Sequence, residues 1–314
     1  MKALVVSGGG SKGAFGGGVS QFLIEELKRD YDIYIGTSTG SLLVPLLSIK
    51  KLDKLKEAYT SVTQKDIFKI NPFRIKKNKN GSIKVCINYF NIIYNVFFRK
   101  KRSFGDASNL HSLITRFLTE RDFNIIKEKK KEVIICTTNM TLAKTEYKSN
   151  YEYGWKDYID WMVSSSTVPP FMEPIIKGGY DYSDGAVLEH APIQEAINKG
   201  ATDIDVIILK KENHELVKER IRNPFHYIIR TVDIMMSEIS RVDLRLRNLK
   251  INEEPVNINV YHTPRELTNN SLIFDKQTMS SWWEEGFDTA KKGLYKSYQL
   301  TKRRVPKLMY DGYK

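Results

Sequence analysis

Ser38 lies at the centre of Gly36-Thr37-Ser38-Thr39-Gly40, a G-x-S-x-G sequence between an apolar segment and a segment that can begin a helix. A serine at this position occupies a strained strand-to-helix turn that pushes its hydroxyl out above a sheet. Glycines two residues away on each side are needed because side chains there would collide. The pattern predicts a nucleophilic serine, and the alternative interpretation is a small-residue turn with no chemistry.

Six residues near the start of the chain, Gly8-Gly9-Gly10-Ser11-Lys12-Gly13, form a second candidate. Glycines let the backbone turn sharply and direct several N–H groups at one point, and a following helix adds partial positive charge. Such a loop suits an anion or the oxyanion that develops during acyl transfer. Gly8, Gly10 and Gly13 also match the dinucleotide-binding pattern G-x-G-x-x-G, with Asp32 placed like the ribose-binding acid. A plain tight turn is the third interpretation.

A general base for Ser38 is not evident among the histidines. In an α/β-hydrolase an acid and then a histidine follow the nucleophile along the chain. None of the five histidines lies in a local pattern typical of a general base. They are His111, His190, His214, His226 and His262. A third motif, Tyr182-Ser183-Asp184-Gly185-Ala186, instead offers the carboxylate of Asp184.

Along the chain the glycine loop comes first, the Ser38 motif follows shortly after, and the Asp184 motif comes much later. Three motifs in this order and spacing resemble those of the patatin-like phospholipases. Between the second and the third, the stretch Val163-Ser164-Ser165-Ser166-Thr167-Val168-Pro169-Pro170-Phe171-Met172-Glu173-Pro174 is similar to the family's A-S-x-A-x-P-x-x-F-x-P sequence. The resemblance covers about residues 1–210. It implies an α/β fold with a central, mostly parallel sheet flanked by helices. It also implies a lipid acyl hydrolase that cleaves ester bonds of membrane glycerolipids without a cofactor or a metal.

The resemblance further implies a catalytic dyad. Ser38 would attack the ester carbonyl, and Asp184 would accept its proton without an intervening histidine. Water activated by Asp184 would then hydrolyse the acyl-Ser38 intermediate. The supporting positions are the oxyanion donors Gly8, Gly9 and Gly10, the elbow glycines Gly36 and Gly40, and the loop residues Lys12 and Gly13.

The sequence departs from the family pattern at two positions. Ser7 precedes the glycines where the family often has aspartate, and His190 stands where the family favours asparagine. Because His190 replaces that asparagine, the family pattern does not specify which hydrogen bonds support the dyad here. Asp181 is a nearby rival for Asp184, although the family pattern argues against it. Lys12 matches a Lys or Arg of the family, and we expect it to anchor the loop, with phosphate binding as the alternative.

Alternating strands and helices must position these residues. Apolar runs predict strands over residues 3–7, 32–36, 133–138, 145–149, 204–209 and 256–260. Helical periodicity predicts helices over residues 14–29, 110–119, 155–165, 192–199, about 215–249 and 277–300, and one that begins at Ser41 and falters near Pro45. Residues 178–185 form a turn-rich stretch. We expect a catalytic core over residues 1–210 and a mainly helical elaboration over residues 211–314 packed on the same domain.

Residues 65–105 form a basic and aromatic insertion in this core. Residues 65–102 contain eleven Lys or Arg against Asp66, a charge of +10, and residues 301–314 add +4, so that the rest of the chain sums to −1. If residues 84–99 are helical, Asn88, Asn91 and Asn95 share one stripe and aromatic residues occupy the other faces. That pattern favours an interfacial helix beside a lipid substrate. The alternative is that the aromatic residues cover the sheet and the basic ones are merely solvated.

The composition excludes several structural classes of protein. With 41% hydrophobic and 28% charged residues among 314, the chain is a folded protein rather than a disordered or fibrous one. Two cysteines, Cys86 and Cys136, fit a reducing compartment, and neither a membrane-spanning run nor a signal-peptide core is present. We therefore expect a cytoplasmic protein that is peripheral on membranes, with an anionic lipid surface as partner and no nucleic acid.

Two other function classes stay open at this point. A dinucleotide-binding oxidoreductase would use the glycine loop and Asp32 but leaves the other two motifs unexplained. A non-catalytic membrane- or nucleic-acid-binding protein rests on the charge of +13 alone. The sequence does not specify the acyl position, the headgroup, the oligomeric state or any activating partner.

Overall fold

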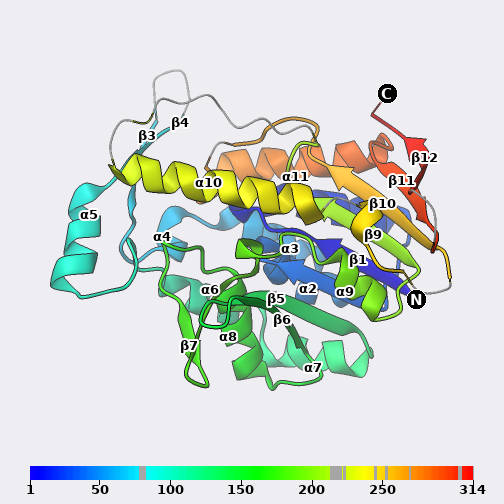
Figure 1. Cartoon of the computed structure of the whole chain (residues 1–314), viewed down its shortest axis with the longest axis horizontal. Coiled ribbons are helices and arrows are strands. Elements are labelled where there is room, and N and C mark those ends of the chain that lie inside the picture. Colours follow the sequence, from blue (N-terminus) through cyan, green and yellow to red (C-terminus); the bar gives the residue numbers. More distant parts are fainter. Residues whose placement is uncertain are drawn as a thin grey trace.

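A ten-stranded sheet runs through the molecule and carries helices on both faces (Figure 1). The computed structural model describes residues 1–77, 83–212, 221, 224–243, 246–251, 254–268, 270–302 and 306–313. Across the sheet, the strands follow in the order β12 (Lys307–Asp311), β11 (Lys296–Leu300), β10 (Val256–His262), β9 (Asp203–Ile208), β1 (Lys2–Val6), β2 (Ile33–Thr37), β5 (Glu132–Asn139), β8 (Tyr180–Asp184) and β7 (Ile175–Lys177), and β6 (Lys144–Ser149) also pairs with β5. The neighbours from β10 to β5 are parallel, which confirms the expected fold class.

The helices of the sheet and of its connections have the following bounds. They are α1 (Gly13–Gln21), α2 (Thr39–Ser48), α3 (Leu52–Ser61), α4 (Gln64–Ile67), α5 (Tyr89–Ile93), α6 (Asn109–Phe117), α7 (Glu120–Glu128), α8 (Trp155–Ser165), α9 (Ile193–Asn198), α10 (Pro224–Asp243) and α11 (Lys276–Lys291). Short 3₁₀ turns are η1 (Gly10–Lys12), η4 (Gly185–Val187) and η5 (Leu246–Asn248), and π-helical turns are η2 (Phe22–Glu26) and η3 (Tyr94–Phe98).

The central strands divide their side chains between two hydrophobic clusters. Leu4 and Val6 of β1 belong to the cluster that includes α1, α2 and α11, whereas Ala3 and Val5 belong to the cluster that includes α9. This division follows from the two-residue period of a strand. Because both faces of the sheet are covered, these strands are apolar along their whole length instead of alternating with polar residues.

Two helices differ from their expected form. The helix expected over residues 14–29 changes from α1 to the π-helical turn η2 at Phe22. The expectation that the helix after the elbow falters near Pro45 is wrong, because α2 continues through Pro45 to Ser48. Its apolar side chains, such as Leu43 and Leu47, are fully buried, and this packing outweighs the one backbone hydrogen bond that proline cannot donate.

The last third of the chain is less helical than expected. The helix predicted to run to Leu300 ends at Lys291, because Gly293 adopts φ 69° and stops it, and residues 296–300 form β11. The strands β10, β11 and β12 extend the central sheet on its β9 side. The helix predicted over residues 215–249 is described from Pro224 to Asp243 as α10, and residues 215–220 lie outside the described residues.

The stretch expected to be rich in turns is a β-hairpin. Strands β7 and β8 pair antiparallel, with Ile175 opposite Tyr182 and Lys177 opposite Tyr180. Gly178 and Gly179 form the turn between them with φ 58° and φ 82°, a conformation that glycine adopts without a steric cost. β8 ends at Asp184, so the hairpin positions this candidate residue.

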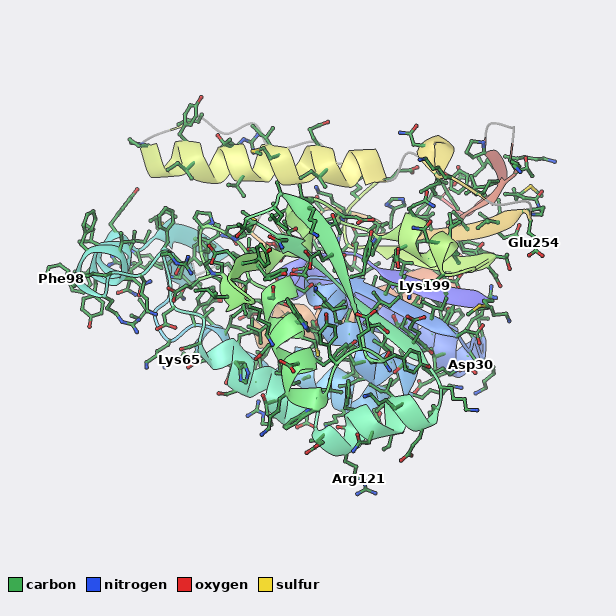
Figure 2. The ribbon with its side chains drawn as sticks, turned by 60° about the horizontal axis from the view of Figure 1, so that its bottom comes forward. Asp30, Lys65, Phe98, Arg121, Lys199 and Glu254 are labelled. Atoms are coloured by element: carbon green, nitrogen blue, oxygen red, sulfur yellow. The ribbon has the colours of Figure 1, made fainter. Side chains whose placement is uncertain are left out.

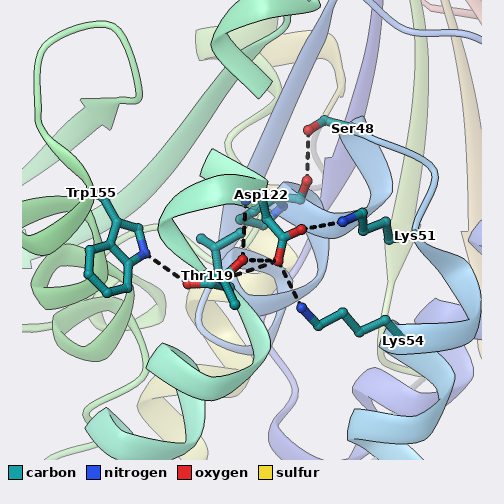
Figure 3. A network of polar contacts seen from close by, with 8 residues as sticks. Ser48, Lys51, Lys54, Thr119, Asp122 and Trp155 are labelled. Carbon is teal, nitrogen blue, oxygen red and sulfur yellow. Dashed lines mark hydrogen bonds and ion pairs between the residues drawn. The ribbon is translucent and has the colours of Figure 1, made fainter. Parts of the chain in front are cut away.

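A network around Asp122 fixes the far end of the elbow helix (Figure 3). Asp122, at the start of α7, accepts hydrogen bonds from the ammonium groups of Lys51 and Lys54, the latter at 2.8 Å. Thr119 caps the same helix end through the Asp122 N–H. Lys51 lies three residues after the end of α2 and caps α3, so these contacts hold the chain close to the end of the helix that begins after Ser38.

Within residues 65–105 the chain builds a hairpin followed by a short helix, and Ile67, Phe68 and Phe73 of this stretch pack into the main hydrophobic cluster. The hairpin pairs β3 (Phe73–Lys77) with β4 (Ile83–Ile87), and α5 continues directly into η3. The helix expected from residue 84 therefore begins only at Tyr89. No helix in the described part of the chain is both long enough and apolar enough to cross a membrane.

Candidate active site

Strand register brings Ser38 and Asp184 together from positions far apart in the sequence. One edge of β5 pairs with β2 as far as Cys136, which lies opposite Thr37. β8 also pairs with β5 from the next residue, Thr137, which lies opposite Asp184, while β6 pairs along residues 134–139. Since a strand has only two edges, β2 and β8 share one of them end to end. The residue that follows β2 is Ser38, so it meets the last residue of β8.

Ser38 occupies a strained turn between β2 and α2. Its backbone has φ 55° and ψ −123°, a region that costs a residue other than glycine about 1–3 kcal/mol. The glycines on either side are required by space. A Cβ on Gly36 would lie 2.3 Å from the carbonyl carbon of Gly40, and a Cβ on Gly40 would lie 2.1 Å from the Val6 carbonyl oxygen. The predicted elbow is therefore present in its geometry as well as in its sequence.

Serine side chains brace this turn from two sides. The Ser38 N–H donates to Ser165 Oγ at 2.9 Å, and the Ser165 hydroxyl donates to the Cys136 carbonyl at 2.6 Å. The Ser41 hydroxyl donates to the Ser38 carbonyl at 2.6 Å. The role of Ser165 was not predicted from the sequence, although it lies in the serine-rich stretch that carries part of the family resemblance. The bracing offsets part of the backbone strain.

The Asp184 carboxylate is in direct contact with Ser38. Ser38 Oγ donates to Asp184 Oδ2 at 2.6 Å, and the Ala186 N–H donates to Asp184 Oδ1 at 2.8 Å. The carboxyl group is fully buried, and this burial raises its pKa to about 7, against the opposing effect of the two hydrogen bonds. A carboxylate with a pKa near neutrality can accept a proton and return it, as a general base and acid must.

The glycine loop lies against this pair. A Cβ on Gly8 would be 3.2 Å from Ser38 Cβ and 3.3 Å from Ala186 Cβ. The Gly8 N–H donates to the His190 carbonyl at 3.2 Å, so it already has an acceptor. The N–H groups of Gly9 and Gly10 donate to no acceptor among the residues that the structure describes. Gly10 has φ 54°, and its Cα faces the Ser271 carbonyl too closely for a side chain.

Lys12 and Gly13 join the loop to the helices behind it. Lys12 is buried, and its N–H donates to the Gly9 carbonyl at 3.1 Å. A Cβ on Gly13 would lie 2.3 Å from Thr39 Oγ1, so glycine lets α1 approach the start of α2. The loop is also held at Ser11, whose N–H donates to the Ser271 carbonyl at 2.8 Å. No sequence motif pointed to this contact with Ser271.

The other two candidate acids, Asp181 and Asp32, have different partners from Asp184. Asp181 bonds Arg102 at 3.1 Å and belongs to the surface of the β7–β8 hairpin. Asp32 directly precedes β2 and accepts the Lys2 N–H at 2.9 Å, so it lies at the opposite end of the parallel strands from the glycine loop, which follows β1. A ribose-binding acid follows the end of its strand, and the dinucleotide interpretation is therefore wrong.

His190 lies beside the loop but stays neutral. Burial, together with the positive charges of Lys210 and Lys12, lowers its pKa to about 3. Its carbonyl holds the Gly8 N–H as described above, so its backbone supports the loop. Among the described residues, no group of three or more His, Cys, Asp or Glu side chains has the arrangement of a metal site.

Comparisons with known proteins agree with this geometry. The family model for the patatin-like phospholipases matches residues 4–197. A solved structure that is similar over 96% of this chain and 68% of its own chain is the crystal structure of VipD from Legionella pneumophila, with a TM-score of 0.52 and 13% sequence identity. That level of identity supports the fold alone. No curated protein sequence matches the chain significantly.

Proposed function

The chain belongs to the patatin-like phospholipase family, and we propose that it cleaves acyl ester bonds of membrane glycerolipids through Ser38 and Asp184. Family membership makes it a hydrolase of carboxylic esters that acts on lipids. The proposal adds the catalytic dyad and the glycerolipid substrate. The observation that carries it is the hydrogen bond of 2.6 Å from Ser38 Oγ to a fully buried carboxylate at a strained elbow.

In the first half of the reaction Ser38 Oγ attacks the ester carbonyl carbon. The hydroxyl proton passes to Asp184 Oδ2, the atom to which it is already hydrogen-bonded. Asp184 then gives this proton to the departing alcohol oxygen as the ester bond breaks. The products of this half are an acyl group on Ser38 and a free alcohol, which in a phospholipid substrate is a lysophospholipid.

The negative charge that forms on the carbonyl oxygen needs fixed donors. We assign this role to the N–H groups of Gly9 and Gly10, because the Gly8 N–H is engaged by the His190 carbonyl. Donors of this kind act on the transition state and not on the substrate, and losing one typically lowers kcat about a hundredfold or more. The loop stands next to the nucleophile, as the close approach of Gly8 to Ser38 indicates.

The second half releases the fatty acid. A water molecule loses a proton to Asp184 and attacks the acyl carbonyl carbon, and the tetrahedral intermediate collapses to a carboxylic acid. The proton returns from Asp184 to Ser38 Oγ, which restores the enzyme. Because Asp184 alone handles both protons, the proposal needs no histidine, in agreement with the lowered pKa of His190.

We also propose that the protein works on the surface of anionic membranes. Several basic side chains of the insertion are exposed and have no acidic partner among the described residues; these are Lys65, Lys69, Arg74, Lys76 and Lys100. Each lysine or arginine near an anionic bilayer contributes about 1 kcal/mol to binding. The net charge of +13 acts in the same direction.

Covalent labelling of the nucleophile tests the dyad. A fluorophosphonate ester should modify the intact protein at Ser38, and mass spectrometry of the peptides should locate the label there. Ser38→Ala and Asp184→Asn should each lower kcat for a soluble ester by at least about a thousandfold, and the double variant should lose little more, because the two residues act as one unit.

Ser48→Ala provides the matched control. Ser48 lies at the other end of α2, and its buried hydroxyl bonds the Pro45 carbonyl at 2.7 Å, so the variant also removes one buried hydroxyl from the same helix. It should keep both labelling and turnover. Labelling at a residue other than Ser38, or substantial turnover by Ser38→Ala, would overturn the proposal.

A further inference from the structure

The short helix α5 and the turn η3 expose an aromatic face. Phe90, Phe97 and Phe98 are 75%, 73% and 76% exposed, and Ile93 and Tyr94 between them are also exposed. These five positions follow the spacing i, i+3, i+4, i+7 and i+8, which places them along one side of a helix. Single exposed apolar residues are ordinary, but a contiguous group of this size marks a surface that another apolar phase covers. We call these five residues the aromatic face.

The opposite side of the same helix faces the protein and carries Asn91 and Asn95 together with the buried Ile92. Asn95 is fully buried and donates through Nδ2 to the carbonyls of Ser103 and Gly105, at 2.9 and 3.1 Å. Asn91 donates through Nδ2 to the Asn71 carbonyl at 2.8 Å. The helix therefore holds amide side chains on its inner side and phenylalanines on its outer side. Hydrogen bonds fix this orientation, so the phenylalanines cannot turn inward without losing them.

The basic residues that follow the helix act mainly as braces. Arg99 pairs with Asp106 at 2.6 Å, Lys101 with Glu173 at 2.9 Å and Arg102 with Asp181 at 3.1 Å. Lys100, in contrast, is exposed with no acidic partner in the described part of the chain. The neighbouring strand β3 adds the exposed Arg74 and Lys76. Phenylalanines beside unneutralised cations match a surface that is apolar inside and anionic at its border.

The aromatic face lies at one end of the molecule, where it can contact a flat lipid surface. Figure 1 places α5 at one end of the longest axis, and the N-terminus and β12 lie at the other end. β1 begins at Lys2, so the parallel strands run toward the end that carries α5, and Ser38 follows one of these strands. In Figure 2, which turns the molecule about the same axis, Phe98 lies at the tip of that end.

We propose that the aromatic face inserts into the outer part of an anionic lipid bilayer, with Arg74, Lys76 and Lys100 contacting its headgroups. This inference rests on the proposed function, because a lipid substrate gives the enzyme a reason to approach a bilayer. It names the surface and the main driving force, which is apolar insertion and not the charge of residues 99–102. The braces Lys101–Glu173 and Arg102–Asp181 connect the aromatic face to the segment that leads to Asp184.

Vesicle flotation of the Ser38→Ala protein tests the inference, because this background leaves the lipids intact. Vesicles of phosphatidylcholine with phosphatidylserine should carry the parent protein upward. Phe97→Ser with Phe98→Ser should lower the partition coefficient about a hundredfold, since the burial of each phenylalanine is worth about tenfold or more. Lys100→Gln should lower it about fivefold, and only on vesicles that contain phosphatidylserine.

The matched control is Leu308→Ser with Met309→Ser. These residues are 43% and 53% exposed on β12, at the opposite end of the molecule (Figure 1), and the change should leave flotation unchanged. Hydrolysis of a soluble ester by the chain with Ser38 intact should be the same for the Phe97 and Phe98 double variant as for the parent, which shows that the variant folds.

Three outcomes would overturn the inference. The first is equal flotation of the phenylalanine double variant and the parent. The second is a parent protein that hydrolyses a soluble ester but does not float with vesicles of phosphatidylcholine and phosphatidylserine. That result would leave the proposed ester hydrolysis standing. The third is light scattering that finds a dimer for the parent and a monomer for the double variant, because the aromatic face would then join two copies. Flotation without any ester hydrolysis would instead overturn the proposed function and support the bilayer contact.

Discussion

In the proposed mechanism, the buried carboxyl group of Asp184 sets the pH range in which the enzyme should work. Burial raises its pKa to about 7, and the hydrogen bonds from Ser38 and from the Ala186 N–H limit that rise. A general base must be ionised, so kcat/KM should increase with pH and level off above about pH 8. At about pH 5, two units below the pKa, about 1% of the carboxyl groups are ionised, so the rate should be about one hundredth of the plateau.

The assay is hydrolysis of a soluble nitrophenyl ester across the neutral range, because its chemistry is free of pH-dependent vesicle charge. The remaining candidate for a titrating group beside the loop is His190. Burial and the charges of Lys210 and Lys12 lower its pKa to about 3, so it stays neutral throughout this range. His190→Asn should therefore leave the midpoint of the profile in place, whatever it does to the plateau. Asp184→Asn should remove the pH dependence together with most of the rate.

Two results would refute this reasoning. If the midpoint of the pH–rate profile lay at about pH 4, the carboxyl group would titrate as it does in water, and the site would admit solvent. A midpoint that disappears in His190→Asn would identify the imidazole as the base, in the manner of the α/β-hydrolases. A profile that falls with rising pH would likewise contradict a base that must lose its proton.

Two stability measurements by urea unfolding follow from the same physical chemistry. Folding raises the pKa of Asp184, so the native state loses stability as pH rises from about 4 through 7. At about pH 8 the free energy of unfolding of Asp184→Asn should therefore exceed that of the parent by up to about 4 kcal/mol. At about pH 4 the two proteins should be equally stable. For Asp122, burial opposes ionisation, but hydrogen bonds from Lys51 and Lys54 hold its pKa well below the ordinary value, so its contribution is present above about pH 4 and is lost in stronger acid. Asp122→Asn should cost about 2 kcal/mol at neutral pH, less in acid, and an unchanged midpoint at both pH values would contradict the role of this network.

Much of the site could be predicted because its residues are marked locally. Ser38 stands between two glycines that the turn requires, and the glycine loop separates an apolar strand from a helix. These constraints act over a few residues, so they are visible in a single sequence. Asp184 has a weaker local mark, and its identification depended on the order of three motifs in the chain. The strands of the parallel centre were predicted for a similar reason, since burial on both faces leaves a continuous apolar run.

Contacts between distant residues could not be predicted in this way. The brace from Ser165 to Ser38 depends on where α8 packs, and the bond from Ser11 to the Ser271 carbonyl depends on the path of a late loop. The strands β11 and β12 lie at and next to the edge of the sheet, and they lack the long buried apolar runs that mark its centre. In the insertion, periodicity suggested an amphipathic helix but not its direction. Hydrogen bonds from Asn95 decide that the aromatic residues face outward.

Three features that each cost this protein stability lie toward the same end of the molecule. Ser38 adopts a strained backbone, Asp184 holds a carboxyl group away from water, and Phe97 and Phe98 remain exposed. Each of these costs on the order of 1 kcal/mol or more, and none is needed to form the sheet. Local rules are expected to fail where function requires it. In the proposed function, an esterase that takes its substrate from a bilayer needs all three features. They are a nucleophile on a strained turn, a general base buried away from water and an exposed apolar surface. We therefore expect the variants at Phe97 and Phe98 to lose activity on vesicles while they keep activity on soluble esters.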